Sequence, residues 1–361
     1  MMLKYNILFL LLLPMAVLAD KGDTEFKKTI EKNFTVNNGA TLDILNKYGK
    51  IVLRTWSKNE VKATIVITGY GKSTSEAEDI AGMVDVESIN SPGAVRLATS
   101  YNPRSGSKWL FSWGNKKDSK DYVKIDYEVY VPQSLSKLIV ENQFGDVIAD
   151  KLPFAADMRL NYCFYDIREI SGALMMNINY CQKGKIGKAG KVVLKAGYSS
   201  MNSDRIDELV VRSNYSDYDI KSVGKIEVQS NYDNYRINDA GKVFSRSNYT
   251  DFKINELQGE VNMTLTYGNA DIRALTTGFT GADFRLTYSD IKLGVPQRQA
   301  LQLDAVLSYG DLRLGGLELK NKNTIKKNTQ LIMTGVTENG NEQSPVIRVQ
   351  GSYSSVGLKS L

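Results

Sequence analysis

The 361-residue chain contains no histidine and only two cysteines. A catalytic thiol would therefore lack its usual histidine base, and a zinc site would have to rely on two thiolates and carboxylates. Apart from one run near the N-terminus, no stretch is apolar enough to cross a bilayer, which takes about 20 apolar residues. Thiol catalysis, zinc chemistry and membrane spans in the mature chain are therefore not expected, and no cofactor is predicted.

The N-terminal segment reads as a secretory signal peptide. Lys4 precedes an apolar run from residue 7 to residue 13, and Val17 and Ala19 occupy the −3 and −1 positions of a cleavage site before Asp20. An uncleaved anchor is the alternative, but the run is short for one. No cysteine follows the cleavage site, so lipid acylation is not expected. The sequence predicts residues 1–19 as a signal peptide and a product exported to the periplasm or the cell surface.

The chain carries a formal net charge of +6, with lysines clustered at residues 114–121, 183–195 and 320–327. Such clusters could attract anionic glycans or lipid head groups. They could equally be solvated loops and strand edges that lysine keeps soluble. No nucleic-acid-binding module is visible, and an exported protein rarely meets nucleic acid, so that class of partner is not expected.

An aromatic residue recurs through most of the chain at steps of 17 to 21 residues. This period is typical of solenoids, in which each repeat stacks on the next. The sequence predicts an all-β fold, a parallel β-solenoid over residues 137–361 with degenerate C-terminal coils. The recurring residues are Phe144, Tyr162, Tyr180, Tyr198, Tyr215, Tyr232, Tyr249, Tyr267, Tyr288 and Tyr309.

Alternation around these aromatics predicts which side chains face inward. Leu209, Val211, Ser213 and Tyr215 share one face of a strand, so the aromatic column is expected to be an inward ladder. After each aromatic the buried positions move to three and five residues onward, beyond two turn-forming residues. A sandwich of antiparallel hairpins is the alternative, but it would not require one constant register.

Two polar columns accompany the aromatics. The preceding position is often asparagine, as at Asn214, Asn231 and Asn248, and stacked amides can hydrogen-bond to one another. The second following position alternates between Asp and Asn until Asp290 and Asp311, which stand in successive repeats. Turn chemistry explains this column. Stacked carboxylates at the break would repel or recruit a cation, so Asp290 and Asp311 are candidate ligand-binding residues. No resident metal is predicted.

Cys163 and Cys181 each follow a repeat aromatic and lie one repeat apart. In stacked repeats they would be neighbours at about 4.8 Å, within the Cα separation that a disulfide tolerates. Stacking in register does not by itself give the required torsion. A disulfide between them is a hypothesis that the spacing allows.

Residues 20–136 are less regular and are predicted to form a β-rich cap over the first repeat. Residues 75–84 read as one short helix with Ser73 or Ser75 as its N-cap. Trp109, Phe111 and Trp113 alternate within a lysine-bearing loop. They are candidate ligand-binding aromatics, although the same alternation is typical of a buried strand.

The chain resembles the bacterial family of putative adhesin domains, exported β-strand-repeat domains of unknown function. The resemblance rests on residues 41–56, the strand and helix that follow, and the NQFGDV and TYGNADI units at residues 142–147 and 266–272. It implies an exported repeat protein and carries no catalytic residues to transfer.

These observations predict a noncatalytic, adhesin-like binding or scaffold protein of the cell envelope that contacts extended glycans or envelope polymers. A structural or signalling component with an envelope protein partner is the alternative. A polysaccharide-processing β-helix enzyme is a third reading, but no cluster of acid, base and arginine departs from the repeat as a catalytic site would.

Overall fold

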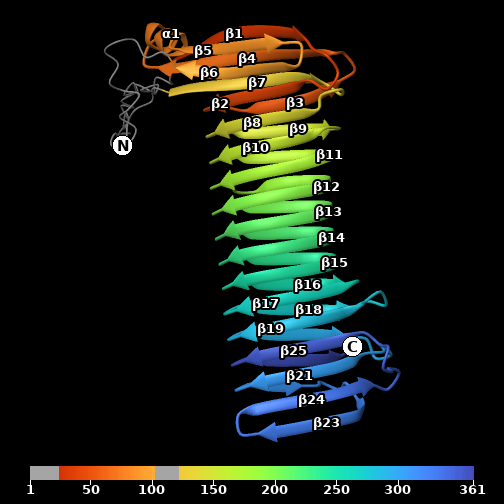
Figure 1. Cartoon of the computed structure of the whole chain (residues 1–361). Helices are drawn as coiled ribbons and strands as arrows, with labels where there is room; N and C mark the ends of the chain where they lie inside the picture. The colour runs from red at the N-terminus through yellow and green to blue at the C-terminus, as the bar shows by residue number, and fades with distance from the viewer. Residues whose placement is uncertain (1–23, 102–121) are drawn as a thin grey trace, which may run out of the picture.

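The computed structural model describes residues 24–101 and 122–361. The prediction of an all-β chain is confirmed, and the described residues contain one helix, α1 (Thr74–Gly82), capped by the Ser73 hydroxyl. All strands belong to one mixed sheet that forms a long column (Figure 1), with parallel pairs through the middle and antiparallel pairs at both ends.

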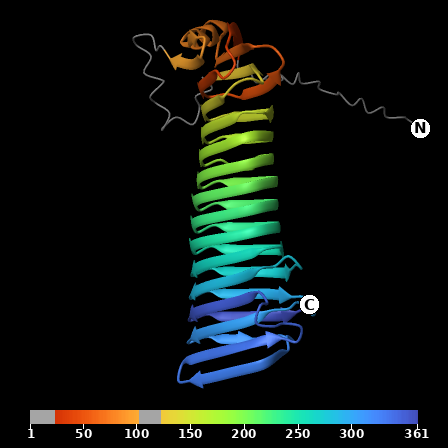
Figure 2. The same cartoon turned by 45° about the vertical axis from the view of Figure 1, so that its right-hand side comes forward.

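The N-terminal region covers one end of the column and carries α1 (Figure 2). Antiparallel partners flank β4, and parallel pairs from β2 and β3 lead into the repeats. Its strands are β1 (Thr24–Thr35), β2 (Thr41–Lys47), β3 (Ile51–Trp56), β4 (Glu60–Gly71), β5 (Val84–Ser91), β6 (Ala94–Tyr101) and β7 (Tyr122–Pro132).

Parallel pairing in a constant register stacks each repeat on the next. The strands of this part are β8 (Lys137–Gln143), β9 (Asp146–Leu152), β10 (Ala155–Asn161), β11 (Phe164–Asn179), β12 (Gly184–Gly197), β13 (Ser200–Asn214), β14 (Asp217–Asn231), β15 (Asn234–Asn248), β16 (Asp251–Leu257), β17 (Glu260–Thr266), β18 (Asn269–Leu275), β19 (Gly281–Thr287) and β20 (Asp290–Val295).

Each repeat contributes to two outer faces. Face A is built from the strand residues that precede the recurring aromatic, and face B from those that follow it. Inward side chains of the two faces form the core, for example Leu209 and Val211 from face A and Tyr218 and Ile220 from face B. The predicted buried positions after the aromatic are therefore correct.

Glycine marks the second bend of several repeats, where the chain passes from face B to the face A strand of the next repeat. A Cβ built on Gly241 would lie 2.1 Å from the carbonyl oxygen of Gly224 in the adjacent repeat. Strands β11 to β15 run through this bend without a break. The aromatic corner, by contrast, interrupts the strands in every repeat.

The C-terminal strands do not stack in sequence order. They are β21 (Gln302–Ser308), β22 (Asp311–Arg313), β23 (Leu319–Lys327), β24 (Gln330–Thr337), β25 (Val346–Ser352) and β26 (Ser355–Ser360). Strand β25 inserts between β19 and β21 and is parallel to both (Figure 1). Strand β26 likewise lies between β20 and β22.

The hairpin of β23 and β24 closes the far end of the column by antiparallel pairing with β21. The degenerate C-terminal segment from 329 to 340 thus lies at the terminal cap. The following repeat, around Tyr353, is instead placed inside the stack. Tyr353 follows Tyr309 in sequence, whereas in space its ring lies between those of Tyr288 and Tyr309.

Val349 provides a test of this inserted order. It is fully buried and faces Phe284 of β19 and Ala305 of β21. Val349→Ala should lower the free energy of unfolding by about 2 kcal/mol, the cost of removing two buried methyl groups and leaving a small cavity. In hydrogen exchange measured by mass spectrometry, amide exchange should accelerate in β19, β25 and β21 together.

The matched control is Val243→Ala in β15, another fully buried valine. Its exchange effect should stay within the neighbouring repeats, because a stacked repeat contacts only its neighbours. Unchanged protection of β19 in Val349→Ala would mean that β19 does not depend on β25.

Candidate functional site

Twelve aromatic rings form a continuous stacked column along one edge of the structure, here called the aromatic ladder. Neighbouring centroids lie 4.6 to 5.5 Å apart with interplanar angles of 1° to 18°. Its members in spatial order are Tyr48, Phe144, Tyr162, Tyr180, Tyr198, Tyr215, Tyr232, Tyr249, Tyr267, Tyr288, Tyr353 and Tyr309.

The ladder faces outward, so the prediction of an inward tyrosine column is wrong. From Phe144 to Tyr309, the ladder residues are 45% to 58% exposed. All twelve have a positive φ, between 50° and 66°. This left-handed corner breaks the strand alternation: the aromatic side chain turns outward, and the next residue takes the inward position.

A left-handed conformation costs a residue with a Cβ about 1–2 kcal/mol, so glycine would ordinarily be favoured at such a corner. Stacked aromatic pairs contribute roughly 0.5–1.5 kcal/mol beyond their buried area, which is of similar size. The stacking can therefore offset the backbone strain. The result is a rigid, ordered row of half-exposed rings.

Small hydroxyl side chains directly after the aromatics hold the corners together from inside. The Ser199 hydroxyl accepts a hydrogen bond from the Cys181 N–H at 3.1 Å, and the Ser216 hydroxyl accepts one from the Ser199 N–H at 3.2 Å. Each hydroxyl also donates to a carbonyl two residues back in its own repeat. In the sequence analysis, the position directly after each aromatic was interpreted as the first of two turn-forming residues, not as part of a buried column.

Asp233 replaces the hydroxyl in one repeat and is almost fully buried. Its carboxylate accepts a hydrogen bond from the Ser216 N–H at 2.8 Å and another from the Ser213 hydroxyl. Burial raises the pKa of Asp233 to about 6, although these hydrogen bonds oppose the rise. It is thus a titratable group directly beneath the ladder.

Asparagine side chains run beside the ladder on face A. The Asn231 amide donates to the Asn214 oxygen at 3.0 Å, and the Asn248 amide donates to the Asn231 oxygen at 2.9 Å. The predicted amide-to-amide hydrogen bonds are confirmed for these three residues. The chain of amides fixes their orientation next to the tyrosine rings.

The acidic column runs beside the ladder on face B. Asn234 donates to Asp217 at 2.9 Å, and Asn269 donates to Asp251 at 3.0 Å, so neutral amides separate the carboxylates. Because β26 is inserted, Ser355 lies between Asp290 and Asp311. The apparent break in the alternation therefore exists in sequence but not in space.

Ser355 also contacts both carboxylates that had been singled out as candidates. Its backbone N–H donates to Asp290 at 2.8 Å. A hydrogen bond from its side chain lowers the pKa of Asp311, with a further contribution from Arg313. The structure thus does not bring Asp290 and Asp311 together, and a ligand role for them stays a prediction.

The two cysteines are buried and free. Their thiols face carbonyl oxygens: Cys163 donates to Asn142 at 3.3 Å and Cys181 to Leu160 at 3.4 Å. A hydrogen bond with the Cys181 thiol, together with burial, raises the pKa of Cys163. They take the place of the later serines in the inner column, and a disulfide between them stays a prediction.

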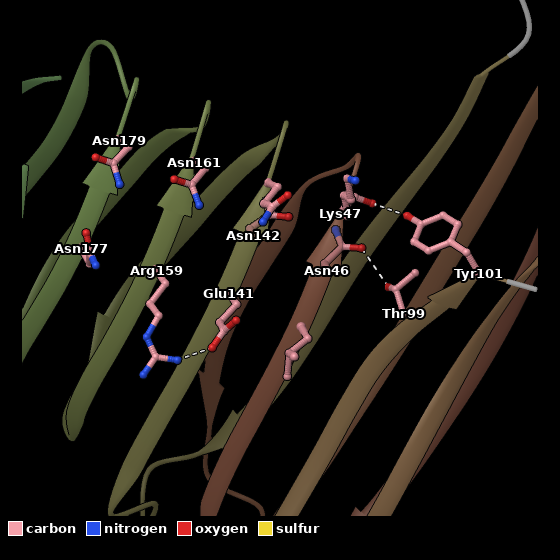
Figure 3. A pocket seen from close by; sticks show the side chains of 12 residues that line it. Asn46, Lys47, Thr99, Tyr101, Glu141, Asn142, Arg159, Asn161, Asn177 and Asn179 are labelled. Atoms are coloured by element: carbon pink, nitrogen blue, oxygen red, sulfur yellow. Dashed lines mark hydrogen bonds and ion pairs between the residues drawn. The ribbon is translucent and has the colours of Figure 1, made fainter. Parts of the chain in front are cut away.

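A polar groove of about 350 Å³ lies on face A near the start of the ladder (Figure 3). The hydroxyl of Thr99 donates to Asn46 at 3.0 Å, and the Tyr101 hydroxyl donates to the Lys47 carbonyl at 2.9 Å. Asn161 and Asn179 continue the amide column along its wall. The predicted aromatics Trp109, Phe111 and Trp113 lie outside the described residues.

Within residues 24–101 and 122–361, no three His, Cys, Asp or Glu side chains come together to hold a metal ion. No helix of the same residues is long and apolar enough to cross a membrane. The repeated groups that the structure presents are ring edges, phenol hydroxyls and amides. They can make many equivalent contacts along one line.

No family model matches the chain, and no curated protein matches it. Solved structures match over nearly its whole length at low identity. One described as a putative adhesin from Parabacteroides merdae is 12% identical, with 92% of this chain and 96% of that chain covered and a TM-score of 0.33. A putative cell adhesion protein from Clostridium sporogenes is 8% identical, with coverages of 94% and 100% and a TM-score of 0.21.

A putative lipid binding protein from Parabacteroides distasonis is 12% identical, with coverages of 91% and 96% and a TM-score of 0.31. Proteins named as adhesins, like the family that the sequence resembles, are therefore among the similar structures. With such low TM-scores, these likenesses carry no argument about what the present chain binds.

Tyr232 allows backbone strain to be separated from ring stacking. Tyr232→Gly and Tyr232→Ala remove the same ring, but only glycine relieves the left-handed corner. The glycine variant should be more stable than the alanine variant by about 1 kcal/mol in chemical denaturation. At Gln229, an exposed position inside β14, the order should reverse. Equal stability of the two Tyr232 variants would remove the strain argument.

Asp233 predicts an unusual pH dependence. Its pKa is raised in the folded state, so folding is favoured while the carboxyl is protonated, and this advantage is lost as the pH rises through about 6. Asp233→Ser should therefore stabilise the protein at pH 8, by up to about 3 kcal/mol, and have little effect near pH 4. Denaturant titrations at both pH values measure this, with exposed Asp217→Ser as the control.

Proposed function

We propose that this chain is an exported, noncatalytic, adhesin-like scaffold that binds an extended polymer of the cell envelope along its aromatic ladder. The observation that carries the proposal is the ordered row of twelve stacked rings, eleven of them exposed, with asparagine amides beside it at Asn214, Asn231 and Asn248. The repeat region of 137–361 is proposed as a β-solenoid, with residues 20–136 as its cap and residues 1–19 as the export signal.

The regular spacing favours a polymer over a small molecule. Each ring edge or amide offers a weak contact, and a linear partner can engage many of them at once, which raises the overall affinity. Stacking and amide hydrogen bonds already order these side chains. Little side-chain freedom is therefore lost on binding, and less binding energy is spent on it.

The chemistry of the ladder suits a glycan. Phenol hydroxyls and asparagine amides can donate and accept hydrogen bonds with sugar hydroxyls, while ring edges contact the apolar C–H groups. The carboxylates beside the ladder are engaged within the protein: Asp217 and Asp251 accept from asparagine amides, and Asp290 accepts from the Ser355 N–H. This regular engagement supports binding rather than hydrolysis.

Affinity electrophoresis in gels containing intact dextran, xylan or alginate tests the proposal. The mature protein should be retarded by at least one of these polysaccharides and should release no reducing ends. A variant with Tyr215→Ser, Tyr232→Ser and Tyr249→Ser should lose the retardation. These three positions are consecutive in the ladder.

The control variant replaces Lys221, Asn238 and Asn255 with serine in the same repeats. Lys221 and Asn238 are exposed and Asn255 is half-buried, all on face B away from the ladder. It should bind as the parent protein does, and circular dichroism should show that both variants are folded. Cleavage of a polysaccharide, equal loss in both variants, or specific capture of a single envelope protein with no glycan retained would overturn the proposal.

A further inference from the structure

A column of positive charge runs parallel to the ladder on face A, three residues before each ladder aromatic. It contains five cations and one carboxylate. In spatial order it reads Leu45, Glu141, Arg159, Asn177, Lys195, Arg212, Gln229, Arg246, Thr264, Arg285, Gln350 and Val306.

The outer cations of this column are neutralised within the protein. Arg159 pairs with Glu141, and Arg285 pairs with Asp283 at 3.3 Å. Lys195, Arg212 and Arg246 are exposed and make no ion pair with any residue that the structure describes. These three residues are called the cationic band.

The one carboxylate near the cationic band does not neutralise its positive charge. Glu227 lies on the same face but pairs with Lys225 at 2.6 Å. Lys225 in turn lies over the ring of Phe244, 5.5 Å from its centroid. The charge at the centre of face A therefore remains available to a partner.

The cationic band borders a groove on face A. Arg212, Arg246 and Arg285 line a groove of about 460 Å³. The one carboxylate in its lining is Glu227, which is paired with Lys225. The Asn214 and Asn248 amides follow Arg212 and Arg246 by two residues and lie between these cations and the aromatic ladder. Guanidinium groups, amides and aromatic rings thus form three parallel columns.

Face B offers the opposite charge beside the ladder. The column there carries Asp217, Asp251, Asp290 and Asp311, which would repel an anion. Farther out on that face, Arg236 is held by both carboxylate oxygens of Asp219. Beside the ladder, a polyanion is therefore attracted on face A and repelled on face B. Farther out on face B, Lys253 and Arg273 line a separate groove of about 730 Å³.

We propose that the polymer is an anionic polysaccharide, which lies along the column axis with its carboxylates on the cationic band and its hydroxyls on the amides and tyrosines. This inference rests on the proposed function. Consecutive repeats are about 4.8 Å apart, so sugar carboxylates spaced about 5–10 Å apart can reach successive cations. Single exposed ion pairs are weak, so a polymer is bound and a lone sugar acid is not.

The test measures affinity of the mature protein for alginate, a carboxylate polymer, and for dextran, a neutral one. The parent protein should prefer alginate, and added salt should weaken that binding by screening the charges. Arg212→Gln with Arg246→Gln should reduce alginate affinity about tenfold, as expected for two exposed ion pairs. Monomeric glucuronate at the same carboxylate concentration should not compete.

The matched control is Lys253→Gln with Arg273→Gln, which removes the same net charge from exposed positions of face B. It should retain alginate affinity within about twofold, which is under 0.5 kcal/mol. A tenfold loss in this control as well would mean that net charge, not the cationic band, governs binding and would overturn the inference.

Two results separate this inference from the proposed function. Dextran binding as tight as alginate binding, unaffected by Arg212→Gln and Arg246→Gln, would overturn the anionic assignment and leave the polymer-binding scaffold intact. Failure to bind dextran, xylan and alginate alike would overturn both. Double-stranded DNA is the last probe. If it binds as tightly as alginate, and Arg212→Gln with Arg246→Gln abolishes that binding, the surface binds polyanions without selectivity and the assignment to a glycan is overturned.

Discussion

The structure depends on the backbone hydrogen bond made at each aromatic corner. The N–H of every ladder residue donates to a carbonyl oxygen of the adjacent layer, at 2.8 to 3.1 Å, as from Tyr215 to Asn231 and from Tyr232 to Asn248. For the last residue, Tyr309, the acceptor is Thr329 of the terminal hairpin. This bond bridges the corner at which the strands are interrupted in every repeat. It holds successive corners in register, and the register is what brings the rings, amides and hydroxyls into straight columns.

Three kinds of side-chain column then reinforce that register. Rings stack outside, asparagine amides bond beside them, and hydroxyls bond from repeat to repeat beneath them. Their contributions are coupled, because a shift of one residue would move the outward ring to the position of the inward hydroxyl. The corner can therefore support tyrosine in a conformation that ordinarily favours glycine. The proposed binding surface and the stability of the fold depend on the same residues, since the exposed ring edges belong to the same stack that holds the corners.

The sequence predicted the parts of this arrangement that follow from period and polarity. The spacing of the aromatics gave the repeat, and Asn214, Asn231 and Asn248 gave the amide column. The outward direction of Tyr215 was not predictable from alternation, because a left-handed φ at a bulky residue leaves no signature in residue type. Asp233 has a residue type that suits a turn, and nothing in the sequence shows that the residue after a left-handed aromatic points inward. The position of Tyr353 was missed because sequence spacing cannot show that a later strand inserts between two earlier ones.

Both ends of the column are capped by strands that do not belong to the regular repeats, which leaves its sides as the surface for the proposed partner. At the C-terminal end β23 pairs only with β24 among the described strands, and its exposed residues include Lys320, Lys322, Lys326 and Lys327. Lysine on an edge strand opposes pairing with another chain, because that pairing would bring like charges together. Growth by end-to-end strand addition is thereby disfavoured. A long partner can then meet the protein along the ladder, where the contacts are numerous and already ordered.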